Sequence, residues 1–405
     1  MKYIPRMLED VVRKAAKEFP VVVLTGPRQS GKTTLLRHSF GRSHGYVSLE
    51  APDIRASASH DPRGFLALHP PPVIVDEIQY VPDLLPYIKE VIDSRRSEKA
   101  LYLLTGSQNL LLLERVTETL AGRAAMLRLL PLSRREAQRD SRRPLFWESA
   151  ARRRKTRASG ILDTWVSFVR GGYPELVADP RRDFVLWHAS YVQTYLERDV
   201  RGLRQIGDLT LFQSFLRTIA ARSGQLLNLT DLARGIGLAV NTAKAWLAIL
   251  EATYQVVIVR PYFANVGKRL VKTPKVYFTD TGTLCYLMGL REGIHAMSGP
   301  MAGPIFETAV LSEILKTLLG RGEEPHVYFF RTSAGSEVDF VIEANARLIP
   351  IEVKSSATPR LEMAEGVAAF RKDFPRKADA GYVVHAGDVS LPLGSGITAI
   401  PFTAL

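Results

Sequence analysis

The chain has 405 residues, of which 46% are hydrophobic and 23% charged, a globular composition that leaves room for roughly two to four domains. No apolar run approaches the length of a bilayer span, which excludes a membrane-spanning helix. Charged residues precede the first apolar run, which excludes a secretory signal. Cys285 is the single cysteine, which excludes a disulfide framework. We therefore expect a cytoplasmic protein without a membrane partner. The net charge of +13 favours a polyanionic partner such as DNA, although an arginine-rich chain also carries charge that is merely solvated.

Residues 1–135 alternate short apolar runs with amphipathic stretches, which is the pattern of a parallel α/β sheet. The strands that this pattern predicts are 21–24, 46–49, 73–75, 101–104 and 125–129.

The first apolar run is followed by the segment 26–33, which fits G-x-x-x-x-G-K-[ST], the pattern of a phosphate-binding loop. Glycines let the backbone N–H groups of such a loop turn inward, and the N-terminus of the next helix adds donors for the phosphates. We expect Lys32 to reach the β- and γ-phosphates and the Thr33 hydroxyl to ligate Mg²⁺. The predicted nucleotide-binding residues are Gly26, Pro27, Arg28, Gln29, Ser30, Gly31, Lys32, Thr33 and Thr34.

A second apolar run, 73–75, ends in two carboxylates, Asp76 and Glu77. We expect Asp76 to hold Mg²⁺ through its water shell, and Glu77 to orient or deprotonate the attacking water. Paired acids at a strand end are otherwise common surface residues, but their distance from Lys32 suits a βαβ crossover. The pair favours hydrolysis over simple nucleotide sensing, because a catalytic carboxylate has a defined task there.

The run 101–104 ends in small polar residues. In ATPases with an additional strand this position contacts the γ-phosphate and the attacking water, so Ser107 is our choice and Asn109 the second candidate. Arg123 is a candidate arginine finger donated to the nucleotide of a neighbouring subunit, and a purely structural arginine is the alternative. The predicted catalytic set is Lys32, Glu77, Ser107 and Arg123.

Residues 136–224 are expected to form a basic linker and a small helical lid. The tract 134–157 is dense in arginine, which fits a solvated surface or a phosphate-contact surface. Helical spacing dominates from 161 to 223.

Residues 225–290 follow the plan of a winged helix: a helix, a glycine turn at 235–237, a second helix from about 240, and strand-like runs that flank a basic segment. The predicted DNA contacts are Asn241, Thr242 and Lys244 on the second helix and Lys268 and Arg269 at the tip of the wing. The alternative is a winged helix used only for packing or protein contacts.

Residues 291–405 return to mixed α/β patterning, with strands near 338–343 and 348–353. Asp339 on one strand and Glu352 and Lys354 on the next, preceded by Glu307 in a helix, resemble the core of the PD-(D/E)XK nucleases. In such a site Asp339 and Glu352 ligate Mg²⁺ and Lys354 activates water or stabilises charge. The alternatives are a retained fold with idle chemistry or a buried network of ion pairs.

Short segments along the whole chain match one family: Ile4-Pro5-Arg6, Gly26–Thr33, Asp76-Glu77-Ile78-Gln79, Leu104–Gln108, Leu120–Arg123, Gly171–Glu175, Tyr195–Val200 and Glu352-Val353-Lys354. On these segments the chain resembles a bacterial and archaeal family of AAA-type ATPases. In that family a P-loop domain precedes a helical and winged-helix segment, and a nuclease-like domain of poorly defined function closes the chain. The resemblance implies ATP hydrolysis, oligomers and nucleic-acid transactions.

We therefore expect an α/β protein with an AAA-type parallel-sheet domain (1–135), a helical lid (136–224), a winged helix (225–290) and a nuclease-like domain (291–405). The expected function is Mg²⁺-dependent ATP hydrolysis coupled to DNA binding and remodelling or translocation, in a homo-oligomeric ring. One alternative is an ATP-regulated nuclease in defence or repair. Another is a nucleotide-switched regulatory or toxin–antitoxin-like DNA-binding module.

Overall fold

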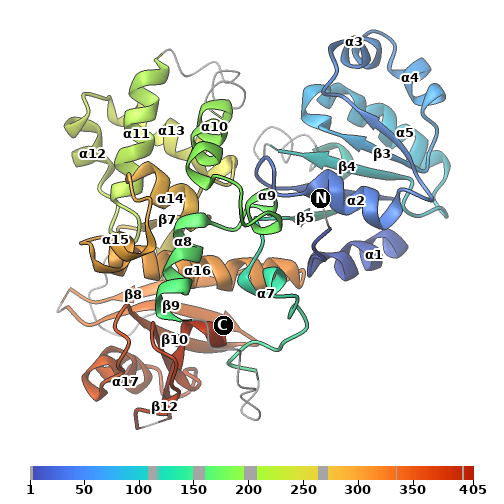
Figure 1. Ribbon diagram of the computed structural model, residues 1–405. Helices are drawn as coiled ribbons and strands as arrows, with labels where there is room; N and C mark the ends of the chain where they lie inside the picture. The colour runs from blue at the N-terminus through green and yellow to red at the C-terminus, as the bar shows by residue number, and fades with distance from the viewer. Residues whose placement is uncertain are drawn as a thin grey trace.

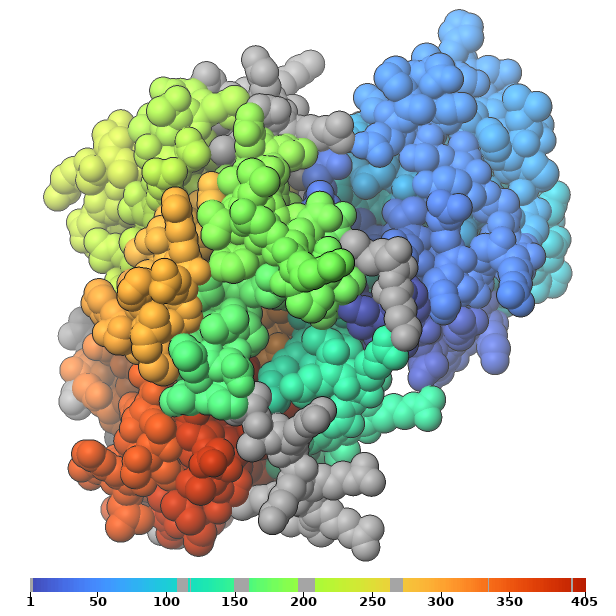
Figure 2. Space-filling view, viewed as in Figure 1, coloured from blue at the N-terminus to red at the C-terminus, as the bar shows by residue number. Residues whose placement is uncertain are grey.

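The structure is a computed structural model that describes residues 3–107, 116, 118–148, 160–195, 208–262, 272–333, 335–394 and 396–405. Asn109, Lys268 and Arg269, which were predicted above as site residues, lie outside the described residues, as does most of the basic tract beyond 148. The amino-terminal domain forms one lobe and the residues after 135 form a second, larger lobe (Figures 1 and 2).

The amino-terminal lobe contains a five-stranded sheet in the order β2-β3-β4-β1-β5, in which each strand pairs parallel to its neighbours. Its elements are α1 (Leu8–Glu18), β1 (Val21–Thr25), α2 (Lys32–Phe40), β2 (Gly45–Ser48), α3 (Pro52–His60), α4 (Pro62–Leu68), β3 (Val73–Asp76), α5 (Leu85–Ser94), β4 (Tyr102–Gly106) and β5 (Ala124–Arg128), with 3-10 turns at Ile78–Tyr80 and Pro82–Leu84. The five predicted strands are confirmed, with small shifts at their ends. Strand β4 lies between β1 and β3.

Burial explains why these strands are short apolar runs. Every residue of β1, β3 and β4 is buried, because helices cover both faces of the sheet. Side chains on one face pack into one hydrophobic cluster and those on the other face into a second. The carboxyl ends of β1, β3 and β4 therefore meet at one rigid edge, where the phosphate-binding loop begins.

A helical segment follows the first lobe. Its helices are α7 (Arg134–Ala137), α8 (Ile161–Arg170), α9 (Pro174–Ala178), α10 (Phe184–Tyr195), α11 (Leu209–Ala221), α12 (Leu229–Gly235) and α13 (Val240–Ala252). In α13 the residues Ala243, Trp246 and Leu250 are buried at helical spacing, which leaves Asn241 and Lys244 on the exposed face.

The second lobe is built on an eight-stranded sheet in the order β12-β13-β11-β10-β9-β8-β6-β7. Its strands are β6 (Val256–Pro261), β7 (Lys275–Phe278), β8 (Val327–Arg331), β9 (Glu337–Ala344), β10 (Arg347–Lys354), β11 (Gly381–His385), β12 (Leu391–Pro392) and β13 (Ile397–Pro401). Its helices are α14 (Thr281–Leu287), α15 (Gly293–Ser298), α16 (Ala302–Gly320) and α17 (Glu365–Asp373), with 3-10 turns at Leu361–Ala364 and Phe402–Ala404.

The hydrophobic core of this lobe is shared by the helical segment and the sheet. Strand β6 pairs with β7 and, in parallel, with β8, so that residues before and after 290 belong to one sheet. The largest hydrophobic cluster includes side chains from Leu130 to Leu405. Within the described part of the chain, none of the helices combines the length and the apolar character needed to cross a bilayer.

Candidate active site

The loop after β1 is held in a conformation that requires glycine at its first position. Gly26 has φ of 148°, and a Cβ at this residue would lie 2.1 Å from the carbonyl oxygen of Leu129. Gly31 has φ of 94° and precedes the first residue of α2. The sequence motif is therefore explained by a backbone that turns tightly against the end of β5.

Gly31, the residue before α2, provides no side-chain cap for the N-terminus of this helix. Lys32 is buried, and its Nζ donates to the carbonyl oxygens of Gly26 and Pro27 at 2.9 Å each. An uncapped helix N-terminus beside a lysine ammonium is the donor set that a phosphate chain requires. The loop thus fits a nucleoside triphosphate.

Asp76, at the end of β3, lies directly opposite the loop. Its Oδ1 accepts hydrogen bonds from the hydroxyls of Thr33 at 2.7 Å and Thr105 at 2.5 Å, and its Oδ2 accepts from the Tyr46 hydroxyl at 3.1 Å. Burial and the Asp76 carboxylate raise the pKa of Tyr46, which keeps its hydroxyl a donor. Thr33 and Asp76 provide adjacent hard oxygen atoms and are the two residues that would hold Mg²⁺ beside a bound nucleotide.

Glu77 is positioned next to this pair by the backbone and by a neighbouring amide. It has a left-handed φ of 58°, and its N–H donates to the Thr105 hydroxyl at 3.0 Å. The Gln79 side chain donates both to the Glu77 carboxylate and to the Ser107 hydroxyl, the latter at 3.0 Å. Gln79 therefore holds the predicted base and Ser107 at one edge of the sheet.

Contacts from outside the sheet also support the loop. The Arg6 guanidinium donates to the Ser30 carbonyl oxygen at 2.8 Å, to the Leu130 carbonyl oxygen at 2.7 Å and to Glu136 at 3.0 Å. Arg6 and Glu136 are both buried. This ion pair ties the amino-terminal segment, the phosphate-binding loop and α7 together.

The second lobe reaches the loop at two further points. The Tyr254 hydroxyl donates to the Thr25 hydroxyl at 2.7 Å, directly before the loop. A Cβ at Gly31 would lie 3.7 Å from Cγ of Pro174, the residue that begins α9. The nucleotide site is therefore in physical contact with the helical segment.

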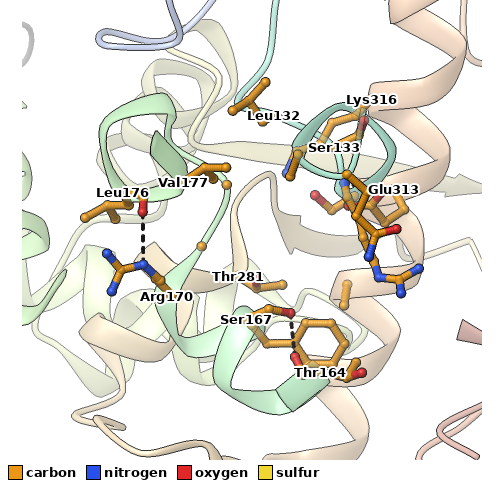
Figure 3. Close-up of a pocket in the computed structure, with 18 of the residues that line it drawn as sticks. Leu132, Ser133, Thr164, Ser167, Arg170, Leu176, Val177, Thr281, Glu313 and Lys316 are labelled. Atoms are coloured by element: carbon orange, nitrogen blue, oxygen red, sulfur yellow. Dashed lines mark hydrogen bonds between the residues drawn. The ribbon is translucent and has the colours of Figure 1, made fainter. Parts of the chain in front are cut away.

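A pocket of about 360 Å³ lies where the two lobes are joined, between the connector at Leu132–Ser133, helices α8 and α16 and the turn before α9 (Figure 3). Figure 3 shows Glu313 and Lys316 on one side of it and Arg170, whose Nε donates to the Leu176 carbonyl oxygen at 3.0 Å, on the other. Burial raises the pKa of Glu313. The pocket marks the junction and lies apart from the residues of the phosphate-binding loop.

Arg123 lies away from the nucleotide site of its own chain. It precedes β5 at the amino-terminal edge of the sheet, opposite the phosphate-binding loop, and pairs with Asp93 of α5 at 2.7 Å. This position does not place it on the loop of the same subunit. A role toward a neighbouring subunit stays a prediction.

The carboxyl-terminal residues that were predicted as a second site do come together. Glu307, Asp339, Glu352 and Lys354 line one cavity of about 920 Å³. The Nζ atom of Lys354 lies 2.5 Å from Oε1 of Glu352, which places both side chains on the same face of β10. Burial and the neighbouring Asp339 raise the pKa of Glu307 to about 7 and that of Glu352 to about 8.

These residues do not fit a divalent metal ion in this arrangement. Lys275 of β7 lies among them, with its Nζ atom 3.1 Å from Oε1 of Glu307 and 3.8 Å from Oδ1 of Asp339. The other oxygen of Asp339, Oδ2, accepts a hydrogen bond from the backbone N–H of Val353 at 2.8 Å. One oxygen, Oε2 of Glu352, is buried without a hydrogen-bond partner, but a single oxygen does not make the octahedral shell of Mg²⁺. In the described residues no group of three or more acidic, histidine or cysteine side chains is arranged to hold a metal.

Residues 18–138 match the family model described as an AAA domain. The chain is also 31% identical over 392 residues to the uncharacterized proteins Rv2008c of Mycobacterium tuberculosis and Mb2031c of Mycobacterium bovis, and the match covers 96% of this chain and 82% of each relative. The chain belongs to the family of these mycobacterial proteins. Its amino-terminal lobe is an AAA-type ATPase domain, and the ATPase part of the expected function is thereby supported.

The remainder of the chain matches two models that are described as domains of unknown function, DUF8612 at residues 163–293 and DUF4143 at residues 302–405. The Walker-type ATPase PABY2304 of Pyrococcus abyssi is a similar solved structure, with 17% sequence identity, a TM-score of 0.45 and coverage of 69% of this chain and 94% of that chain.

Several residues that shape the ATPase site were missed in the sequence. Tyr46, which contacts Asp76, carries no motif of its own. Thr105, Gln79 and Arg6 appeared above only within segments of the family resemblance, with no role assigned to them. Lys275 carried a usable signal, because an ionisable residue inside the apolar strand 275–278 is rarely buried without a partner.

Replacing Glu77 with glutamine is expected to lower ATP turnover about a hundredfold or more while ATP still binds, because the amide keeps the shape but loses the basic oxygen. Steady-state phosphate release and binding of a fluorescent ATP analogue measure the two effects. The matched control is Glu98→Gln, at an exposed acid of the same domain. Unchanged turnover in Glu77→Gln would remove Glu77 from the catalytic set.

Proposed function

We propose that this protein is a Mg²⁺-dependent ATPase that couples ATP hydrolysis to DNA binding and to remodelling or translocation, as a homo-oligomeric ring. The observation that carries the hydrolytic part is the arrangement of Glu77, Gln79 and Ser107 beside Asp76 and the phosphate-binding loop. A base with a positioned neighbour favours repeated turnover over a simple nucleotide switch.

In this proposal each residue has one task. The uncapped N-terminus of α2 and Lys32 bind and orient the phosphates, and they stabilise the charge that builds up on the γ-phosphoryl group. Glu77 takes a proton from the attacking water, and the Ser107 hydroxyl contacts the same water. Mg²⁺, held by Thr33 and Asp76, would neutralise charge on the β- and γ-phosphate oxygens.

The DNA-binding part of the proposal is supported by charge and by the exposed face of α13. Asn241 and Lys244 are exposed and Thr242 is half-buried, so the first turns of the helix present polar groups outward. An Asn side chain reads base edges and a lysine contacts phosphates, and the net charge of +13 favours approach to a polyanion. Lys268 and Arg269, which lie outside the described residues, stay predicted DNA contacts.

The ring is proposed on the resemblance to AAA-type ATPases, which implies oligomers. Arg123 lies at the opposite end of the sheet from its own phosphate-binding loop, so a finger role would be toward the nucleotide of a neighbouring subunit. Light scattering in the presence of an ATP analogue tests this assembly. A monomer under all nucleotide conditions would contradict the ring and the finger together.

DNA should stimulate ATP turnover if the coupling is correct, and the double variant Asn241→Ala/Lys244→Ala should lose most of that stimulation. We expect this variant to bind duplex DNA of every sequence more weakly. The slope of log affinity against log salt concentration should fall by about one, because one lysine–phosphate contact is lost. The assay compares phosphate release with and without single-stranded, duplex and branched DNA.

The control for this experiment is Lys372→Ala, which removes an exposed lysine of α17. Turnover that is indifferent to every DNA, together with no gel shift at low salt, would contradict the DNA part of the proposal. A very slow single turnover with tight capture of a protein partner would instead favour the nucleotide-switched module.

A further inference from the structure

Lys275 is the centre of the carboxyl-terminal cluster. Its Nζ atom lies 2.9 Å from Glu337, 3.1 Å from Glu307 and 3.8 Å from Asp339, and its side chain is 4% exposed. The Tyr277 hydroxyl, two residues further along β7, donates a hydrogen bond to the same oxygen of Glu307 that faces Lys275. Three carboxylates from α16 and β9 therefore converge on one ammonium group.

The ammonium lies between Glu307 and Asp339, two of the acids that were predicted to surround a divalent ion. A metal ion held by Glu307 and Asp339 would need their oxygen atoms at about 2.0–2.6 Å, and both of these side chains are already directed at Lys275. A second cation between the same carboxylates would be repelled by the buried ammonium at short range, where solvent screens little.

The acids next to this set have partners within the chain as well. Glu352 is paired with Lys354 through Oε1, and the second oxygen of Asp339 is committed to the backbone N–H of Val353. Glu337 also lies 3.3 Å from Arg331. Each inner carboxylate thus has a cationic or N–H partner supplied by the chain itself.

We propose that Lys275 is the resident cation of this cluster and excludes divalent metal ions from it, so that the carboxyl-terminal domain works without a metal. The lysine is supplied by β7, an edge strand that precedes residue 290, whereas the acids belong to α16, β9 and β10. The two segments are locked together by the same charges. The domain then has a binding or a structural role, and it does not cleave phosphodiesters with Mg²⁺.

The test is binding of Mn²⁺ to the full-length, nucleotide-free protein, followed by electron paramagnetic resonance of the free ion. Wild type and Lys275→Arg, which retains the charge, are expected to bind no Mn²⁺ through Asp339. Lys275→Met is expected to bind Mn²⁺ at least about tenfold more tightly, because the cluster gains one net negative charge. Adding Asp339→Asn to Lys275→Met should remove that binding.

Two outcomes would overturn the proposal. The first is Mn²⁺ bound to the wild type and lost in Asp339→Asn, a comparison that does not depend on the folding of the Lys275 variant. The second is a folded Lys275→Met protein that gains no Mn²⁺. Asp76→Asn identifies any ion held at the ATPase site, so neither result depends on the proposed coupling to DNA.

Discussion

Lys32→Ala is expected to abolish ATP hydrolysis, with a loss of at least about a hundredfold in turnover, because removal of one preorganised charge from a reacting phosphate has an effect of that size or larger. The ammonium is buried beside the Gly26 and Pro27 carbonyl oxygens, and no other lysine lies in the loop. Phosphate release under saturating ATP and Mg²⁺ measures the change. The affinity for ATP should fall in the same variant.

The control is Lys17→Ala, which removes an exposed lysine from the last turn of α1 and should leave turnover unchanged. Preserved turnover in Lys32→Ala would mean that the loop at 26–33 is not the site of hydrolysis, whatever the family of the domain.

Arg6→Met is expected to have the largest effect on stability. Breaking a buried ion pair by removing one partner costs about 3–5 kcal/mol, because the other charge stays buried without compensation. Here Glu136 would stay buried without a cationic partner, although the N–H groups of Met7 and Ser133 and the Ser133 hydroxyl would still donate to it. The carbonyl oxygens of Ser30 and Leu130 would each lose a donor. Thermal and urea unfolding of the AAA domain, followed together with ATP affinity, measure the loss.

Two comparison variants define this effect. Arg6→Lys keeps the charge but not the planar fork, so it should recover only a part of the stability. Arg63→Met breaks the exposed Arg63–Glu90 pair of the same domain and should leave unfolding unchanged. An Arg6→Met protein as stable as the Arg63 variant would show that the buried pair does not hold the loop.

Much of the AAA domain could be predicted because its signals are local. Five short apolar runs predict five strands, of which β1, β3 and β4 are fully buried, and the segment 26–33 predicts a conformation that only glycine permits at Gly26. Asp76 ends a strand and Glu77 follows it directly, so their place at the edge of the sheet follows from the pattern of a parallel sheet.

The contacts that complete the site join residues far apart in the chain, and no local pattern specifies them. Arg6 meets Glu136 across 130 positions, and Tyr254 meets Thr25 across 229. The parallel pairing of Arg260 with Tyr328, which joins β6 to β8, likewise has no signature in either strand. The spacing of Asp339, Glu352 and Lys354 indicated a cluster, but the lysine from β7 that changes its chemistry lies outside that pattern.

The residues that build the cores of the two lobes are synthesised at different times. All strands of the first sheet lie between Val21 and Arg128, so the ribosome releases everything that this sheet needs early in synthesis. The largest cluster of the second lobe packs Leu405 together with side chains that begin at Leu130. A growing polypeptide therefore carries a complete nucleotide domain while its other half still lacks the residues required to bury its apolar surface.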